Sequence, residues 1–398
     1  MASISTALVV GGGVAGPVTA AALAKAGISA TVYEAYPEPT PEAEHGIGGL
    51  LALEPNGIVA LDVIGAAAGV LAAGTPITRS RMAIGARTVD LAAALPGLPA
   101  RQAIERADLH RVLRARAVEA GVPFEYERRL VSVTEEGDGV VAHFADGSSA
   151  RGDVLIGADG VRSTVRTLID PAAPDAGYTG LLGFGGYASA DIEVEPATMT
   201  FAFGRRAYYL YWRHGDGRIA WGVNLPSPYV SLSEARRTPP EEWLRTLREV
   251  YADDEPGALL AATTPPSSLQ VVGALHIMPP VPQWHRGRLV LVGDAVHAPS
   301  NSTGQGASLA IESGIELARC LRDLPTPAAA FAAYEGLRRA RVEKIAARGA
   351  RISRTKAPGP LARRIMPLVL PLVFRPPVVA RTAAEEQRYA IDWDAPVA

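Results

Sequence analysis

The stretch from Ala7 to Glu34 constrains the fold of this chain more than any other. A short apolar run leads into the glycine turn Gly11-x-Gly13-x-x-Gly16, and an alanine-rich segment and a second apolar run then end at Glu34. This order predicts a strand, a tight turn, a helix and a second strand. Because the spacing is that of a dinucleotide-binding βαβ unit, the sequence predicts a dinucleotide cofactor.

Each glycine of the turn has its own physical role in such a unit. Gly11 permits the turn, Gly13 lets the backbone approach a pyrophosphate, and Gly16 lets the helix pack closely on the strand. Glycine-rich turns also serve plain packing. The strand before the turn, the helix after it and the acid at the end of the second strand favour binding over packing.

The helix N-terminus and the acid complete this predicted site. The helix begins around Val14 and Ala15, where free N–H groups and positive partial charge hold a phosphate without a lysine. Glu34 is placed to accept the ribose hydroxyls. The motif alone does not separate NAD from FAD.

Two later apolar strands end in the same way, in glycine and an acid. One runs into Gly157-Ala158-Asp159-Gly160 and the other into Gly293-Asp294. In an open α/β sheet, ligands lie at the carboxyl ends of the strands. Three such ends predict one extended ligand that is contacted along its length.

Composition limits the classes of protein that remain. A length of 398 residues allows two or three domains, and a net charge of −2 gives no basic footprint for nucleic acid. The single cysteine, Cys320, excludes an internal disulfide and indicates a reducing cytoplasm. No stretch offers the roughly 18 uninterrupted apolar residues that a membrane span needs. The apolar segment Met366–Phe374 is short and broken by prolines, so we interpret it as a packed C-terminal segment.

The remaining chain alternates between β-rich and helical stretches. Residues 124–144 are expected to form a meander of three strands that starts at Phe124, and residues 178–277 are expected to be β-rich. The stretch 76–99 is interpreted as an excursion out of the first domain. Helices are expected near Ala328–Ala350 and Arg381–Tyr389.

These motifs, in this order, resemble the single-component FAD-dependent aromatic monooxygenases with the p-hydroxybenzoate hydroxylase fold. The resemblance implies an α/β fold with a Rossmann-like FAD-binding domain, an inserted β-sheet substrate domain and a helical C-terminal region. The expected ranges are 1–75, 100–177 and 278–325 for the FAD-binding domain, 76–99 and 178–277 for the substrate domain, and 326–398 for the C-terminal region.

The resemblance also implies roles for residues. Arg106 is expected on the FAD phosphates, where a guanidinium offers a rigid donor fork. Asp159 is expected near FAD and NAD(P)H, although it equally suits a cap of the following helix. Asp294 would accept a hydrogen bond from a hydroxyl group of the ribityl chain. The remaining expected cofactor contacts are Gly11, Gly13, Val14, Ala15, Gly16, Glu34, Gly293, Gly304, Gln305 and Gly306.

The reaction implied by the resemblance is hydroxylation of an aromatic or polyketide-like compound. NAD(P)H reduces the flavin, O2 adds to form a C4a-hydroperoxide, and one oxygen passes to the substrate. No metal is expected. The chain departs from the family at Asn301, often a proline, and at Ser313, usually an acid. His297 is expected to be structural, because no acid–base pair is evident around it.

The substrate pocket is less constrained by the sequence. Tyr209, Tyr211 and Arg213 alternate and therefore share one face of a strand, which is a candidate pocket wall. Tyr208 and Trp212 share the other face. Ordinary aromatic packing explains the pattern equally well.

Three other functions remain open at this point. A flavin-dependent halogenase would carry a Trp-x-Trp-x-Ile-Pro motif, which is absent, and a tunnel lysine. The only lysines are Lys25, Lys344 and Lys356, which we expect to lie away from the tunnel. A reductase or oxidase of the same fold would bind FAD in the same way. A non-catalytic flavoprotein would sequester a small molecule without turnover.

Overall fold

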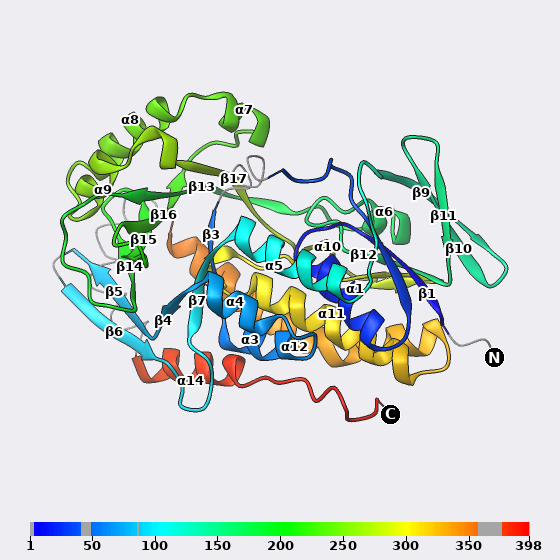
Figure 1. The fold of residues 1–398 in the computed structure, drawn as a ribbon. Helices are drawn as coiled ribbons and strands as arrows, with labels where there is room; N and C mark the ends of the chain where they lie inside the picture. Colours follow the sequence, from blue (N-terminus) through cyan, green and yellow to red (C-terminus); the bar gives the residue numbers. More distant parts are fainter. Residues whose placement is uncertain (1–3, 41–48, 86, 357–375, 398) are drawn as a thin grey trace.

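The computed structural model describes residues 4–40, 49–85, 87–356 and 376–397 of the chain (Figure 1). The apolar segment Met366–Phe374 lies outside the described residues. Two large sheets form the body of the protein, and long helices pack beneath them (Figure 1). The fold is the mixed α/β architecture that the sequence predicts.

The first sheet has six strands in the order β18-β19-β12-β1-β2-β8. β1 pairs in parallel with both β2 and β12, and β12 pairs in parallel with β19. Most of the central residues are Val, Leu and Ile with almost no exposed surface, as expected for a parallel sheet that is covered on both faces. The strands are β1 (Thr6–Val10), β2 (Ser29–Tyr33), β8 (Phe124–Glu125), β12 (Val154–Gly157), β18 (His285–Arg286) and β19 (Leu289–Leu291).

A small antiparallel meander packs against this sheet. It consists of β9 (Leu130–Glu136), β10 (Gly139–Phe144) and β11 (Ser149–Gly152), and it comes so close that a Cβ at Gly152 would lie 3.0 Å from Leu8. The expectation that the meander starts at Phe124 is wrong. Phe124 instead pairs in parallel with Val32 of β2, because the chain there completes the edge of the first sheet before it turns.

The second sheet has seven strands in the order β17-β13-β16-β15-β14-β5-β6. The stretch interpreted as an excursion supplies two of them, because β5 pairs in parallel with β14. Helices α7 to α9 cover one face, where Leu244, Leu247 and Tyr251 join the sheet in one apolar core. The strands are β5 (Arg79–Ile84), β6 (Arg87–Ala93), β13 (Gly177–Ala188), β14 (Thr198–Phe203), β15 (Tyr208–Arg213), β16 (Ile219–Pro226) and β17 (Gln270–Ile277).

A three-stranded sheet, β3-β7-β4, lies between the two large sheets. Its strands are β3 (Leu50–Leu53), β4 (Thr75–Ile77) and β7 (Arg101–Glu105). Ala103 of β7 shares an apolar cluster with Trp212 of β15, and the hydroxyl of Tyr187 on β13 donates to Glu105 at 2.5 Å. The face of the seven-stranded sheet that carries Tyr187 and Trp212, the inner face, therefore contacts the three-stranded sheet.

The helices complete the core and lead to the C-terminus. α1 packs on α11, α11 packs on α12, and α14 with the tail runs along the lower edge (Figure 1). The helices are α1 (Ala15–Lys25), α3 (Pro55–Asp62), α4 (Ala67–Ala73), α5 (Arg106–Glu119), α6 (Thr164–Ile169), α7 (Leu232–Arg237), α8 (Pro240–Tyr251), α9 (Gly257–Thr263), α10 (Asp294–His297), α11 (Gly306–Asp323), α12 (Pro327–Thr355) and α14 (Pro376–Gln387), with single 3₁₀ turns η1 (Pro266–Ser268) and η2 (Asn301–Thr303).

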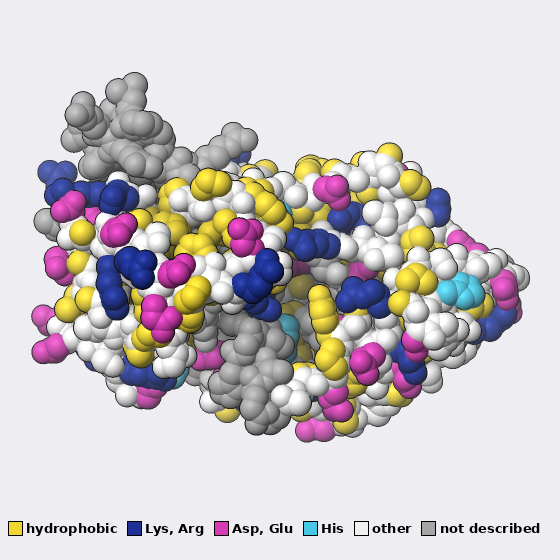
Figure 2. All heavy atoms as spheres, turned by 90° about the horizontal axis from the view of Figure 1, so that it is seen from above, with side chains coloured by type: hydrophobic (Ala, Val, Ile, Leu, Met, Phe, Trp, Pro, Cys, Tyr) yellow, Lys and Arg dark blue, Asp and Glu magenta, His cyan; other side chains and the backbone are white. Residues whose placement is uncertain are grey.

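The described helices and the face seen in Figure 2 show the general character of the surface. Within the described ranges, no helix has the length and apolar character to cross a bilayer. On the face seen in Figure 2, arginine and lysine side chains are interspersed with acidic and hydrophobic ones. This mixture agrees with the net charge of −2.

Candidate functional site

The glycine turn contains two positions fixed by packing and one that faces open space. A Cβ at Gly16 would lie 1.8 Å from the carbonyl oxygen of Gly11, and a Cβ at Gly11 would lie 2.4 Å from that of Ala158. Gly11 also has a φ of +109°, which side chains rarely adopt. A Cβ at Gly13 would meet no atom within 4 Å. The turn therefore leaves room at Gly13 for a group that is not protein, as the pyrophosphate of a dinucleotide requires.

The helix that follows the turn keeps its N–H groups available. α1 begins at Ala15 after Val14, and no side chain caps this terminus. Glu34 lies beside the turn, where its carboxylate accepts hydrogen bonds from the N–H of Gly12 at 2.6 Å and from that of Tyr36 at 3.0 Å. The predicted acid is therefore placed next to the predicted glycines.

Asp294 and Arg106 are accessible side chains that the surrounding protein partly shields from water. Both side chains have exposed surface, yet burial raises the pKa of Asp294 and lowers the pKa of Arg106. A group that is accessible and still desolvated lies in a recess enclosed by protein. The two charges also influence each other.

Gly293 brings the strand end that carries Asp294 against the first helix. Its φ is +60°, and a Cβ there would lie 2.8 Å from the Cβ of Ala15 and 3.3 Å from that of Ala310. The glycine turn, α10 and α11 therefore meet at one point. This is the convergence of strand ends that the sequence predicts.

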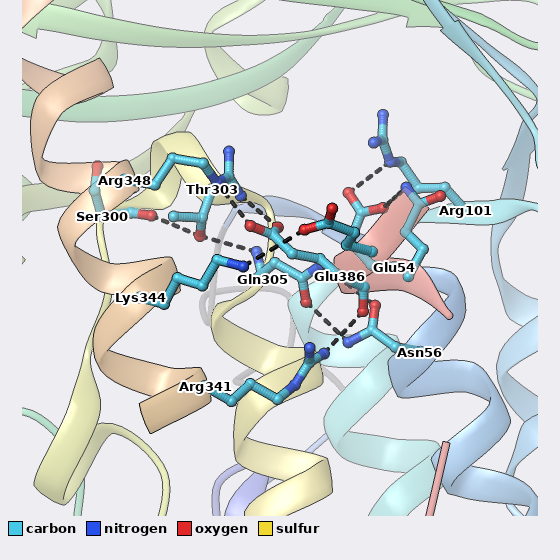
Figure 3. Close-up of polar contacts among 12 residues, drawn as sticks. Glu54, Asn56, Arg101, Ser300, Thr303, Gln305, Arg341, Lys344, Arg348 and Glu386 are labelled. Carbon is cyan, nitrogen blue, oxygen red and sulfur yellow. Dashed lines mark hydrogen bonds and ion pairs between the residues drawn. The ribbon is translucent and has the colours of Figure 1, made fainter. Parts of the chain in front are cut away.

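The start of α11 forms the next wall of the site. Gly304 has a φ of +66°, and the N–H of Gln305 donates to the hydroxyl of Thr303 at 3.0 Å (Figure 3). The N-terminus of this 18-residue helix has no side-chain cap, and a Cβ at Gly306 would meet only Pro299, at 3.8 Å. These features leave the positive end of a long helix available to an electron-rich group.

A buried polar network beneath this helix start was not predicted from the sequence. The carboxylate of Glu312 has no exposed surface and accepts from Arg341 at 2.9 Å and from Asn56 at 2.6 Å, and it pairs with Arg338 at 2.6 Å. Burial alone would raise the pKa of Glu312, but the arginines outweigh it and hold the pKa below its usual range. Asn56 also donates to the side chain of Gln305 at 2.9 Å, so the network fixes Gln305.

The same network reaches the C-terminal helix α14. Glu386 accepts from Arg348 of α12 at 2.8 Å, and its carbonyl oxygen accepts from Arg341 at 2.8 Å (Figure 3). Gln387 donates to Glu54 at 2.9 Å, and Glu54 pairs with Arg101 at 2.7 Å. Helix α14 is thus tied to the residues that hold the start of α11.

Asp159 caps the helix that follows it. Its carboxylate accepts from the hydroxyl of Ser163 and from the N–H of Val165 at 3.1 Å, and burial raises its pKa. Of the two roles expected for Asp159, the structure shows the helix cap. Its expected role toward FAD and NAD(P)H stays a prediction.

His297 and Ser313 are structural partners. Nε2 of His297 lies 2.9 Å from the hydroxyl of Ser313, which also accepts from Arg338 at 3.3 Å. Burial lowers the pKa of His297 to about 3, and the charge of Arg338 adds to this effect. The histidine is therefore neutral, and the serine in place of an acid makes a neutral contact. These contacts agree with the structural role expected for His297, which stays a prediction.

The candidate pocket wall formed by Tyr209, Tyr211 and Arg213 is wrong. Tyr209 is 2% exposed and packs edge-on against Tyr251 of α8, so this face belongs to the apolar core under the outer helices. Arg213 donates to backbone carbonyls of a turn and a loop. On the opposite face, Trp212 packs against the three-stranded sheet and Tyr208 lies beside Lys356.

One lysine does not lie where the sequence reasoning placed it. The Nζ of Lys356 lies 3.7 Å from the ring centroid of Tyr208, on the inner face of the seven-stranded sheet. The position of the lysines therefore no longer argues against a halogenase, whereas the missing Trp-x-Trp-x-Ile-Pro motif still does. Across the parts of the chain that the structure describes, no group of three or more His, Cys, Asp and Glu side chains is arranged to hold a metal.

Comparison with known proteins identifies the family. The model of the FAD binding domain family FAD_binding_3 matches residues 5–348, which is most of the chain. The chain therefore belongs to this family of FAD-dependent monooxygenases, and the expected family, fold class and FAD cofactor are confirmed.

Individual relatives support the same class. The chain is 30% identical over 351 residues to the FAD-dependent urate hydroxylase of Klebsiella pneumoniae. This alignment covers 85% of this chain and 87% of that protein. It is 32% identical over 375 residues to the 3-amino-4-hydroxybenzoate 2-monooxygenase of Streptomyces cremeus, covering 87% and 86%. The crystal structure of Klebsiella pneumoniae HpxO with FAD and uric acid has the same fold, with a TM-score of 0.81, 23% identity and 96% of each chain covered.

Proposed function

We propose that this protein uses NAD(P)H and O2 to hydroxylate an aromatic or polyketide-like small molecule. The observation that carries the proposal is that Arg106 and Asp294 are accessible yet desolvated and interact with each other, while the turn at Gly13 is open. Relatives named as urate and aminohydroxybenzoate monooxygenases support the substrate class. The single cysteine, Cys320, supports a cytoplasmic location.

Within this proposal, the described residues hold the cofactor along its length. The turn at Gly13 and the start of α1 would hold the pyrophosphate with N–H donors, and Glu34 would accept from the adenosine ribose. Arg106 would pair with the phosphates, and Asp294 would accept from the ribityl chain. The start of α11 would face the pyrimidine edge of the flavin ring.

When bound, FAD supplies hydride acceptance from NAD(P)H and the activation of O2. The protein residues contribute position and exclusion of water. Gln305 is held by Asn56, so the wall at the start of α11 is fixed before any ligand arrives. The inner face of the seven-stranded sheet would close the other side of the substrate site.

The test is a visible spectrum of the purified protein, followed by NADPH oxidation in air with a panel of phenolic compounds, purines and polyketides. We expect a flavin spectrum, oxidation stimulated by one compound, and a product heavier by one oxygen. A flavin spectrum with oxidation that no compound stimulates would favour a reductase or an oxidase. Tight binding of a compound without turnover would favour sequestration, and a colourless protein that takes up no FAD would refute the proposal.

The role of Asp294 has its own test. Asp294→Ala should lose most bound flavin while the protein still folds, because the change removes a proposed flavin contact without emptying a core position. Loss of a charge-assisted hydrogen bond predicts affinity for FAD about 10- to 100-fold weaker. Asp138→Ala is the matched control, because that carboxylate is 83% exposed in a distant turn. Full flavin occupancy in Asp294→Ala would refute the assignment.

A further inference from the structure

Lys356 lies where the seven-stranded sheet meets the flavin-edge loop, residues 301–306. Its Nζ lies 3.7 Å from the ring centroid of Tyr208 on β15 and 2.9 Å from the side-chain amide of Asn224 on β16. The other end of that amide lies 3.0 Å from the amide nitrogen of Asn301. One amine therefore contacts the inner face of the sheet and, through a single amide, the flavin-edge loop.

The positive charge of Lys356 has no counter-charge among the described residues. The side chain is 5% exposed, and no described carboxylate lies within ion-pair distance of Nζ. The segment that follows, residues 357–375, contains no Asp or Glu. The charged group that acts on Tyr208 is Arg101, which is also positive. A buried cation without a counter-charge is costly, and burial lowers the pKa of Lys356 to about 7.

The amide of Asn224 suits both protonation states of this lysine. With its oxygen toward Nζ, the amide accepts from the ammonium. With its NH2 group toward Nζ, it donates to the neutral amine, while its oxygen accepts from Asn301 at 3.0 Å. The residues around Lys356 thus allow the charged form without supplying the negative charge that would fix it.

We propose that Lys356 binds an anionic oxygen of the substrate, and that the substrate is an aromatic compound with a phenolate, carboxylate or enolate group. This inference rests on the proposed function, because it takes the inner face of the sheet as a wall of the substrate site. The anionic oxygen would supply a counter-charge that no described residue supplies.

The small number of lysines allows a direct test that needs no knowledge of the substrate. The chain has only Lys25, Lys344 and Lys356, so lysine labelled with 13C at Cε gives three NMR signals, and Lys356→Met assigns the third. FAD-loaded protein is titrated at pH 8 with benzoate and, separately, with benzamide, which has the same ring and no charge. Lys25 and Lys344 are exposed and serve as internal references.

We expect benzoate to shift the signal of Lys356 saturably toward that of the ammonium form, with little effect on the two references. Benzamide should leave all three signals in place. A Lys356 signal that benzoate does not move, or three signals that move alike, would overturn the inference. A protein that takes up no FAD would instead refute the proposed function, so the two failures are distinguishable.

Variants then separate binding of the substrate from a structural role. For a charged substrate found in the NADPH assay, Lys356→Met should raise KM about 10- to 100-fold, the effect of losing a charge-assisted hydrogen bond. The KM for an uncharged analogue and the FAD content should stay unchanged. Lys344→Met is the control, because Lys344 lies on helix α12, which ends directly before Lys356. Equal losses for charged and uncharged substrates in Lys356→Met would show that the lysine only supports the fold.

Discussion

The glycine turn allows cofactor binding and protein stability to be separated by two neighbouring substitutions. In Gly16→Ala, the new Cβ would lie 1.8 Å from the carbonyl oxygen of Gly11, about 1.6 Å short of the 3.4 Å at which contact is ordinary. The clashing atom belongs to the backbone of the turn, so no change of side-chain rotamer can relieve the clash. Overpacking typically costs about 1–3 kcal/mol, and we expect the upper end or more here.

Gly13→Ala should behave in the opposite way. Its Cβ would meet no protein atom within 4 Å, and its φ is not positive, so the free energy of unfolding of the apoprotein should stay the same or rise by up to about 1 kcal/mol. The methyl group would occupy the space proposed for the pyrophosphate. We expect the Kd for FAD to rise about 10- to 100-fold, equivalent to about 1.4–2.8 kcal/mol.

Two measurements on the flavin-free protein decide between these outcomes. Urea denaturation gives the free energy of unfolding, and quenching of flavin fluorescence gives the Kd for FAD. Gly336→Ala is the control, because its Cβ also meets nothing within 4 Å but lies on α12. The reasoning is refuted if Gly13→Ala destabilises the apoprotein as much as Gly16→Ala does, or if it binds FAD with the affinity of the unmodified protein.

Three further predictions concern two buried groups. In Glu312→Gln, the free energy of unfolding measured by urea denaturation should fall by about 3–5 kcal/mol, because Arg338 and Arg341 lose their shared carboxylate. The control is Glu343→Gln, whose carboxylate is 40% exposed and whose free energy of unfolding should fall by less than about 1 kcal/mol. Equal losses in the two variants would contradict the burial argument. Because the folded pKa of Glu312 is depressed, its contribution should be complete above about pH 4.3 and lost as the pH falls through the folded pKa. Cys320, whose pKa burial raises to about 12, should react with Ellman's reagent only after unfolding, and rapid reaction in the folded protein would show that the thiol is accessible.

The parts of the fold that the sequence predicts well are those with local signals. The turn from Gly11 to Gly16 depends on spacing within a few residues, and the acids Asp159 and Asp294 follow directly on apolar strands. Their convergence follows from the general rule that the carboxyl ends of parallel strands meet. The short strand at Phe124 was misplaced because two residues carry no period that assigns them to a sheet.

The parts that were missed depend on distant contacts. Alternation shows that Tyr209 and Tyr208 lie on opposite faces of a strand, but not which face the helices α7 to α9 will cover. Glu312 meets Asn56 from a remote segment, and Lys356 reaches β15 from the far end of α12. No local sequence pattern predicts either contact. A carboxylate or a lysine on a helix more often faces solvent, so only the folded structure identifies these two as buried.

The pairing of the first sheet has a consequence for the synthesis of the protein. The register aligns Ala7 with Val154 and Leu155 with Leu289. A ribosome that has released the glycine turn has therefore not yet made the strands that flank β1 on that side, nor Asp294. Such non-local pairing folds slowly and leaves an apolar strand exposed while the chain grows. Because the proposed FAD site includes Asp294, it is complete only after these strands have been made, so FAD is expected to stabilise the finished protein and not to direct the first steps of folding.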